Sequence, residues 1–465
     1  MRLVHLALQG ERHVDRHPSR STDAVCLGLQ QAILGLSLLA LVLPGSASGA
    51  TLTLEQAIDK ALAANPSVRA ARLEAIAAGE RTSQSYARHL GDADLVGTAS
   101  RFEAARLVRP LWGPIDSQTI AALPFDRDQF HYGAVWQIPI FAGGALFEGD
   151  RAARLLEAAA VKTAARAQDE LRFNVSAAYR NVLGVRRAID AAVSYEQALE
   201  HDESSARLRV ATEAWASVDA DKVSFALASA RARTAALRSQ LTSASVLLAA
   251  LMGDDPTQFN PDLQDIFDEP VTQLPVVAEL TVQAADLRPD LAAARDTAEA
   301  QSRRSAAVRG GFWPQIALAG SFLMNDGPSA GPPVATWDLT ILVKIPLFAD
   351  VGRAFAVREA DAAAAAAAER ERAKSLEVQS QVVDAVGRLA AARAAHEAGK
   401  AQRVLGAEVA RVERMRFESG VGKVEDYLHA RVQALDGETG FWQSLYTLQS
   451  SIDYLALVTG NGGSK

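Results

Sequence analysis

Three ionisable residues near the C-terminal end of the chain are spaced so that their side chains could act together. Glu425 and Asp426 lie four and three positions before His429, so in a helix all three can share one face. Carboxylates beside an imidazole could hold a cation, respond to pH or ligate a transition metal. More often, such a grouping is only a solvated helix face near a turn. The residues alone leave these interpretations open.

No set of residues in the sequence points to catalysis. The sequence has no GxxxxGK[ST] phosphate loop, no HExxH zinc motif and no dinucleotide-binding fingerprint. Its single cysteine, Cys26, cannot form a disulfide within the chain or build a cysteine-based zinc site. We therefore expect no catalytic, cofactor-binding or metal site, and no enzymatic activity.

Composition favours long helices and argues against a nucleic-acid partner. The 465 residues carry a net charge of −7, whereas a general nucleic-acid binder usually has a basic excess. Hydrophobic residues make up 49% of the chain, and many of them are alanine. Alanine with Leu, Glu and Arg is typical of long helices that pack closely against one another.

Residues 1–50 have the pattern of a signal peptide and leader. Arginines precede an apolar run from Ala32 to Leu43, which at about 12 residues is too short for a membrane-spanning helix of about 20. Small residues follow as far as Ala50, which predicts cleavage after that residue. Cys26 precedes the apolar run and would be lost with it, so we expect no lipid anchor.

The remaining sequence contains one pattern twice. Residues 65–72 match residues 288–295, and residues 136–142 match residues 343–349. A segment rich in Pro and Asp lies between the two copies and reads as a linker. The predicted organisation is therefore a first repeat over 51–252, a linker over 253–280, a second repeat over 281–460 and a tail over 461–465.

Each repeat is predicted to hold a helix, two strands and a long helical hairpin. The first helix runs from about Leu54 to Leu90, or from Leu280 to Gly310, and Pro66 and Pro289 suit the first turn of a helix. Later in each repeat, apolar residues recur at steps of three and four, which predicts a coiled-coil seam. Helices of about 50 residues there would be rods of about 75 Å.

The predicted strands alternate between apolar and polar residues. The apolar positions that we assign to a membrane-facing side are Tyr132, Trp136, Ile138, Trp337, Leu339, Ile341 and Val343. Alternating segments of about 10 residues suit a transmembrane β-barrel, although a half-buried sheet in a soluble protein has the same pattern. Four strands cannot close a barrel, so a membrane-spanning chain would have to oligomerise.

Three motifs carry a family resemblance. Residues 52–66 (LTLEQAIDKALAANP), residues 138–144 (IPIFAGG) and residues 417–430 (FESGVGKVEDYLHA) occur in this order. They are similar to the opening, the strand-to-helix turn and the second hairpin tip of TolC-family outer-membrane efflux proteins. The resemblance extends over residues 51–460.

The resemblance implies a mainly α fold with a small β part. Long helical hairpins would form a periplasmic α-barrel, and each chain would add four strands to a trimeric 12-stranded transmembrane β-barrel. The implied function is a passive channel in the bacterial outer membrane for tripartite efflux or type I secretion. The implied partners are two further copies, outer-membrane lipid, a periplasmic adaptor and an inner-membrane pump of the RND, ABC or MFS type. The alternative is a secreted periplasmic coiled-coil scaffold without channel activity.

The resemblance also places a constriction at the hairpin tips. Asp426 matches the first of two tip aspartates in TolC itself, whereas His429 stands at the second. Three copies of such a site would narrow the pore, repel anions and hold cations. The first hairpin reverses without the family's glycine, so either of two aspartates could lie at its tip. The predicted constriction residues are Glu425, Asp426, His429, Gly420, Gly422, Asp219 and Asp221.

Overall fold

The computed structural model describes most of the chain after the predicted leader. The described residues are 51–110, 123–213, 215–257, 259, 262–266, 273–346 and 351–462. The predicted signal peptide over 1–50 lies outside them, as do parts of the predicted linker and the last three residues of the tail.

The described residues hold two sets of four helices with nearly equal lengths. The first set is α1 (Leu54–Ala64), α2 (Pro66–Ala87), α4 (Ala145–Ala211) and α5 (Ser217–Met252). The second set is α6 (Val277–Leu287), α7 (Pro289–Gly310), α8 (Val351–Glu418) and α9 (Val424–Thr459). Their lengths are 11, 22, 67 and 36 residues in the first set and 11, 22, 68 and 36 in the second. The two halves of the chain are thus two copies of one helical unit.

Each half opens with two helices where the sequence predicts one. Proline cannot donate a backbone hydrogen bond and suits the first turn, so α2 and α7 begin anew at Pro66 and Pro289. The residue before each proline donates a hydrogen bond to the last turn of the hairpin's return helix. The Asn65 side chain donates to the Leu251 carbonyl at 2.9 Å, and Arg288 donates to the Val458 carbonyl at 3.4 Å.

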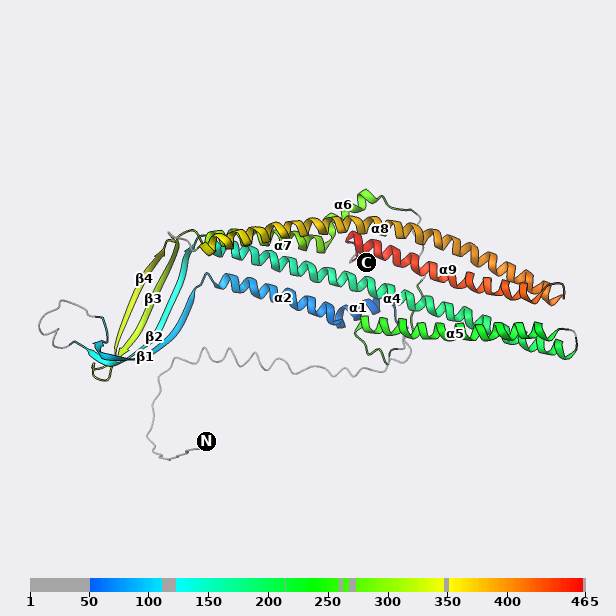
Figure 1. Ribbon diagram of the computed structural model, residues 1–465, viewed down its shortest axis with the longest axis horizontal. Coiled ribbons are helices and arrows are strands. Elements are labelled where there is room, and N and C mark those ends of the chain that lie inside the picture. Colours follow the sequence, from blue (N-terminus) through cyan, green and yellow to red (C-terminus); the bar gives the residue numbers. More distant parts are fainter. Residues whose placement is uncertain are drawn as a thin grey trace, which may run out of the picture. The chain divides into compact units, whose positions relative to one another are not determined.

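The hairpins α4–α5 and α8–α9 run side by side (Figure 1). At 67 residues and 1.5 Å per residue, α4 is about 100 Å long. The outgoing helices are longer than predicted and the return helices shorter. The reason is packing: the first part of α4 lies against α2 and α7 rather than against α5, while α8 likewise packs on α7.

The predicted coiled-coil seams form the core of the hairpins. Val175 and Val182 of α4, and Val378 and Val382 of α8, are each at most 1% exposed. Among the described residues, α5 is the one helix whose length and apolar composition would suffice to cross a membrane. It contacts α4, α1 and α9 as the return arm of the first hairpin.

Four antiparallel strands form one sheet in the order β1-β2-β3-β4. They are β1 (Asp92–Leu107), β2 (Phe125–Ala142), β3 (Gln315–Asp326) and β4 (Val334–Lys344). β2 leads directly into α4 through Gly143 and Gly144, which have φ values of 63° and 80°. The sheet therefore lies at the base of the hairpins, at the opposite end of α4 from the tip (Figure 1).

One face of the sheet is apolar across all four strands. The pairing register places Leu95, Ala134, Phe322 and Trp337 in one row. The same register puts all seven predicted membrane-facing residues on this face. Six of the seven are exposed, with Trp337 at 69%. Trp136 is half-buried because its indole lies against Gly320, where an added Cβ would approach the ring to 2.4 Å.

The opposite face is polar and hydrogen-bonded across the strands. His131 Nδ1 lies 2.9 Å from Asn325 Oδ1, and the Asn325 amide donates to Thr336 Oγ1 at 2.8 Å. Ser321 donates to the Asp338 carboxylate on the neighbouring strand. The sheet therefore has one apolar and one polar surface, and among the described residues no helix packs on either surface.

At two glycines of α9, we expect one extra methyl group to have opposite effects on the free energy of unfolding. At Gly437 an added Cβ would lie 2.8 Å from the Gln402 carbonyl of α8, whereas at Gly440 it would meet nothing within 4 Å. We expect Gly437→Ala to lower the free energy of unfolding by about 1–3 kcal/mol through overpacking. Gly440→Ala should raise it by about 0.5–1 kcal/mol, because alanine favours a helix. Thermal denaturation followed by helical circular dichroism measures both; equal shifts would contradict the close α8–α9 contact.

Candidate functional site

The two hairpins reverse direction with different residues in the left-handed conformation. In the second hairpin Gly420 takes it, at φ 78°, as expected for glycine. In the first, where the family's glycine is missing, Glu213 does so at φ 56°. Gly422 does not have a positive φ. Its role is instead a close approach, since an added Cβ would lie 3.0 Å from the Phe417 backbone nitrogen.

An aromatic cluster joins the two tips. Trp215, from the first reversal, meets Phe417 of α8 edge to face at 5.2 Å between ring centroids. Phe417 in turn stacks on Tyr427 of α9 at 4.6 Å. The Arg209 guanidinium lies 5.0 Å from the Trp215 ring, within cation–π range. The tips therefore contact each other through a continuous cluster of aromatic rings.

A buried hydroxyl adds a polar link between the hairpins. Tyr427 donates to the Asp202 carboxylate of α4 at 2.7 Å, and Arg431 donates to the Tyr427 hydroxyl at 2.9 Å. Tyr427 is 1% exposed, and burial together with the nearby Asp202 charge raises the pKa of its phenol. The hydroxyl thus stays protonated and can act as a donor to Asp202.

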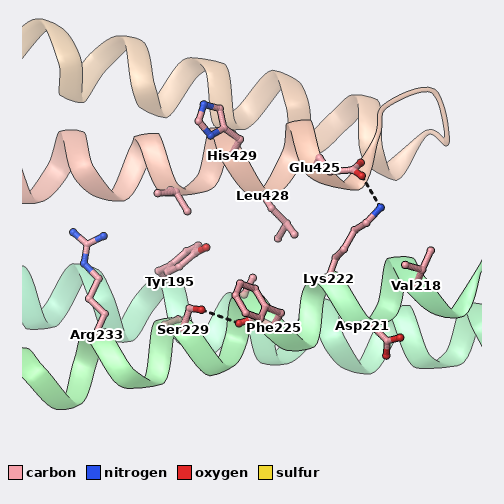
Figure 2. A pocket seen from close by; sticks show the side chains of 13 residues that line it. Tyr195, Val218, Asp221, Lys222, Phe225, Ser229, Arg233, Glu425, Leu428 and His429 are labelled. Carbon is pink, nitrogen blue, oxygen red and sulfur yellow. Dashed lines mark hydrogen bonds and ion pairs between the residues drawn. The ribbon is translucent and has the colours of Figure 1, made fainter.

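A lysine bridges the return helices. Lys222 Nζ of α5 lies 2.5 Å from Glu425 of α9 (Figure 2). It also lies 3.0 Å from Asp219 of its own helix. The Lys222–Glu425 contact lowers the pKa of Glu425 and raises the pKa of Lys222. All three side chains are partly exposed, so solvent screening weakens the attraction.

A groove of about 830 Å³ lies between α5 and α9 beside this bridge. Figure 2 shows Phe225, Leu428 and Tyr195 along its walls. Phe225 is 76% exposed, which is unusual for a large apolar side chain on a helix that packs in a hairpin. Charged residues stand at the groove as well, among them Asp221 and Arg233.

The predicted constriction residues do not all meet. Glu425, His429 and Asp221 line the groove, and Asp219 joins them through Lys222. Asp426 is not among the lining residues: it is exposed and forms no hydrogen bond or ion pair within the described part of the chain. Across the described ranges, no three His, Cys, Asp or Glu side chains are grouped to hold a metal ion.

Sequence reasoning missed the residues that join the hairpins. Tyr427 and Asp202 are 225 positions apart, and Lys222 and Glu425 are 203 apart. The positions of single residues carry no sign of such a pairing. A usable signal was the apolar seam itself, since Leu428 and Leu435 of α9 pack against residues of α4 and α5.

Comparison with known proteins agrees with the resemblance in the sequence. Residues 280–461 match the family model described as outer membrane efflux protein. No curated protein matches the sequence.

Solved structures share the fold over most of the chain. The CmeC outer membrane channel of Campylobacter jejuni is 17% identical, with a TM-score of 0.77 over 88% of this chain and 86% of that chain. The VceC outer membrane protein of Vibrio cholerae is 18% identical, with a TM-score of 0.73 over 88% and 96%. The MtrE outer membrane channel of Neisseria gonorrhoeae, in its open state, is 19% identical, with a TM-score of 0.70 over 88% and 89%.

These findings confirm the resemblance and the expected fold class. The family model supports the resemblance across the second half, and the solved structures extend the fold to both halves. The chain has the TolC-like architecture of long helical hairpins on a small antiparallel sheet.

The buried link predicts a measurable coupling between the hairpins. Tyr427→Phe should lower the free energy of unfolding by about 1.5–3 kcal/mol, because it removes a hydrogen bond to a charged group. In a double-mutant cycle with Asp202→Ala, which removes the acceptor, most of this loss should disappear. Tyr454→Phe is the matched control, since the Tyr454 hydroxyl has no hydrogen bond to described residues and its loss should cost little. A Tyr427→Phe effect that is independent of residue 202 would refute the link.

Proposed function

We propose that this protein is an outer-membrane channel of a tripartite export system. The observation that carries the proposal is the sheet, whose apolar face is exposed and whose edge strands β1 and β4 each pair on one side only within the described chain. In lipid, unpaired backbone groups cost several kcal/mol each. Further copies of the sheet satisfy these edges, and three copies give a closed barrel of twelve strands.

The height of the apolar face supports this placement. On β2 it extends from Phe130 to Ile140, about 33 Å along the strand at 3.3 Å per residue. At a strand tilt of about 40°, that is a band about 25 Å tall, the value usual for outer-membrane barrels. The polar face, with His131, Asn325 and Asp338, then lines the lumen.

The proposed assembly extends from the outer membrane into the periplasm. The helical hairpins, about 100 Å long, form a tunnel, and their tips face a periplasmic adaptor and an inner-membrane pump of the RND, ABC or MFS type. The protein would be a passive duct rather than an enzyme, with energy supplied by the pump. The described residues contain no grouping that selects one kind of cargo.

The hairpin tips would form the narrow entrance of this duct. Asp426 of the second tip has no ion-pair partner among the described residues, and three copies would concentrate negative charge at the pore. The Tyr427–Asp202 and Lys222–Glu425 contacts would hold the hairpins together around it. Opening of the entrance would have to break or stretch these contacts.

Substitutions at two adjacent residues of β4 distinguish a membrane channel from a scaffold outside the membrane. Leu339 lies on the apolar face and Thr340 on the polar face. We expect Leu339→Arg to destabilise insertion by about 2–4 kcal/mol, whereas Thr340→Arg faces water and should insert normally. Membrane fractionation and heat-modified gel mobility of the full chain measure the detergent-extracted trimer. A water-soluble monomer that tolerates both changes would favour the coiled-coil scaffold.

The free aspartate predicts a difference in cation block. Asp426→Asn should weaken block of single-channel current by divalent cations several-fold, because it removes three charges from the entrance. Asp219→Asn is the matched control: Asp219 occupies the same position in the first return helix, but it is paired with Lys222. Unchanged block in Asp426→Asn would place Asp426 on an ordinary solvated helix face.

A further inference from the structure

The junctions between the sheet and the helices carry an excess of positive charge. We call this region the inner rim: residues 86–91, 141–154, 304–314, 344–346 and 351–358. Within these limits it holds eight basic and two acidic residues, and the acidic residues Asp92 and Glu359 directly follow two of its segments. The basic residues are Arg88, Arg151, Arg154, Arg304, Arg309, Lys344, Arg353 and Arg358, and the acidic ones are Glu148 and Asp150.

The opposite end of the sheet has no such excess. This outer rim comprises residues 99–110, 123–130 and 325–334, and it holds four basic and four acidic residues. The basic residues are Arg101, Arg106, Arg109 and Arg127, and the acidic ones are Glu103, Asp126, Asp128 and Asp326. The charge at the inner rim is therefore a property of that end, not of the sheet as a whole.

Most inner-rim cations lack an acidic partner. Arg151 pairs with Glu148 at 2.7 Å and Arg309 with Asp361 at 2.8 Å. The other six have no carboxylate within ion-pair distance among the described residues. Arg353 donates instead to a neutral group, the Gly311 carbonyl, at 2.9 Å. Its charge is thus fixed beneath the turn that ends α7 and remains uncompensated.

Exposed aromatic residues accompany these charges. Trp313, in the turn held by Arg353, is 64% exposed, and Phe312 beside it is 41% exposed. This turn packs on the β2–α4 turn, because an added Cβ at Gly143 would lie 2.9 Å from the Trp313 Cβ. Exposed Trp next to an apolar band is typical of the boundary between acyl chains and headgroups.

We propose that the inner rim binds the phosphate headgroups of anionic glycerophospholipids in the periplasmic leaflet of the outer membrane. The inference rests on the proposed barrel, whose apolar band ends where the rim begins. Basic side chains within a Debye length of about 8–10 Å attract lipid phosphates, and water screens them less next to the apolar band. The aromatic residues seat the glycerol and acyl region, while the unpaired cations meet the phosphate.

The test compares two lipids that share acyl chains and phosphate but differ in the headgroup alcohol and in net charge. The full chain, extracted as the detergent-solubilised oligomer, is titrated with phosphatidylglycerol or phosphatidylcholine of equal acyl chains, and native mass spectrometry counts the bound lipid. We expect a preference for phosphatidylglycerol. Combining Arg88→Gln, Arg353→Gln and Arg358→Gln should reduce that preference by about fivefold for each cation removed.

Two control variants separate a lipid site from general effects of charge. Combining Arg101→Gln, Arg106→Gln and Arg109→Gln removes equal charge from the outer rim and should leave the preference unchanged. Arg→Lys changes at residues 88, 353 and 358 keep the charge and should retain most of the preference.

Equal binding of the two lipids by the unaltered protein would overturn the inference, as would equal losses in the inner-rim and outer-rim variants. Saturating inorganic phosphate should displace little lipid; full displacement would mean that the rim recognises phosphate alone. Gel mobility and conductance of each variant keep this result separate from the channel itself. A conducting trimer without lipid preference refutes only the lipid site, whereas a soluble monomer refutes the channel.

Discussion

The unsatisfied backbone edges of a four-stranded sheet are the constraint on which the rest of this structure depends. β1 and β4 each pair on one side within the described chain, and the face they share is apolar from Leu95 to Val343. Such a sheet is unstable in lipid until other copies pair with its edges. In the proposed trimer, three copies would share one axis and their long helices would lie side by side. That arrangement would cover exposed apolar side chains such as Phe225 on α5 and Val404 on α8.

The two halves of the chain share one framework of helices but differ in the residues at their tips. Helix lengths are preserved between the halves, and residues 65 and 288 reach the ends of their return helices in the same way. Asp219 and Asp426 both occupy the third residue of a return helix, yet Asp219 pairs with Lys222 whereas Asp426 has no ion-pair partner among the described residues. A twofold repeat thus retains its backbone while its two tips acquire different charges, as expected if the framework is structural and the tips are functional.

The sequence predicts the features that follow from a periodic pattern of residues. It does not predict the contacts between residues that are far apart in the chain. Alternation identified the apolar face correctly, because strand side chains must alternate. Pro66 and Pro289 predict helix starts. We expect one helix across each proline, whereas the structure has two. The lengths of the hairpin arms were missed, since an Ala-rich seam continues whether its partner is α5 or α7. The Tyr427–Asp202 link and the Arg353–Gly311 contact depend on tertiary packing, which no local pattern encodes.

The continuity of α4 and α8 connects the two ends of the molecule mechanically. Neither helix contains a proline, so each passes from the sheet to the tip without a break. A sideways shift of one helical pitch, about 5.4 Å, at the end of a 100 Å rod needs a tilt of only about 3°. Gly143 and Gly144 at the base of α4 can absorb a rotation of that size. In the proposed channel, small adjustments at the sheet end would therefore be enough to separate the tips, and the tip contacts rather than the rods would determine how readily they part.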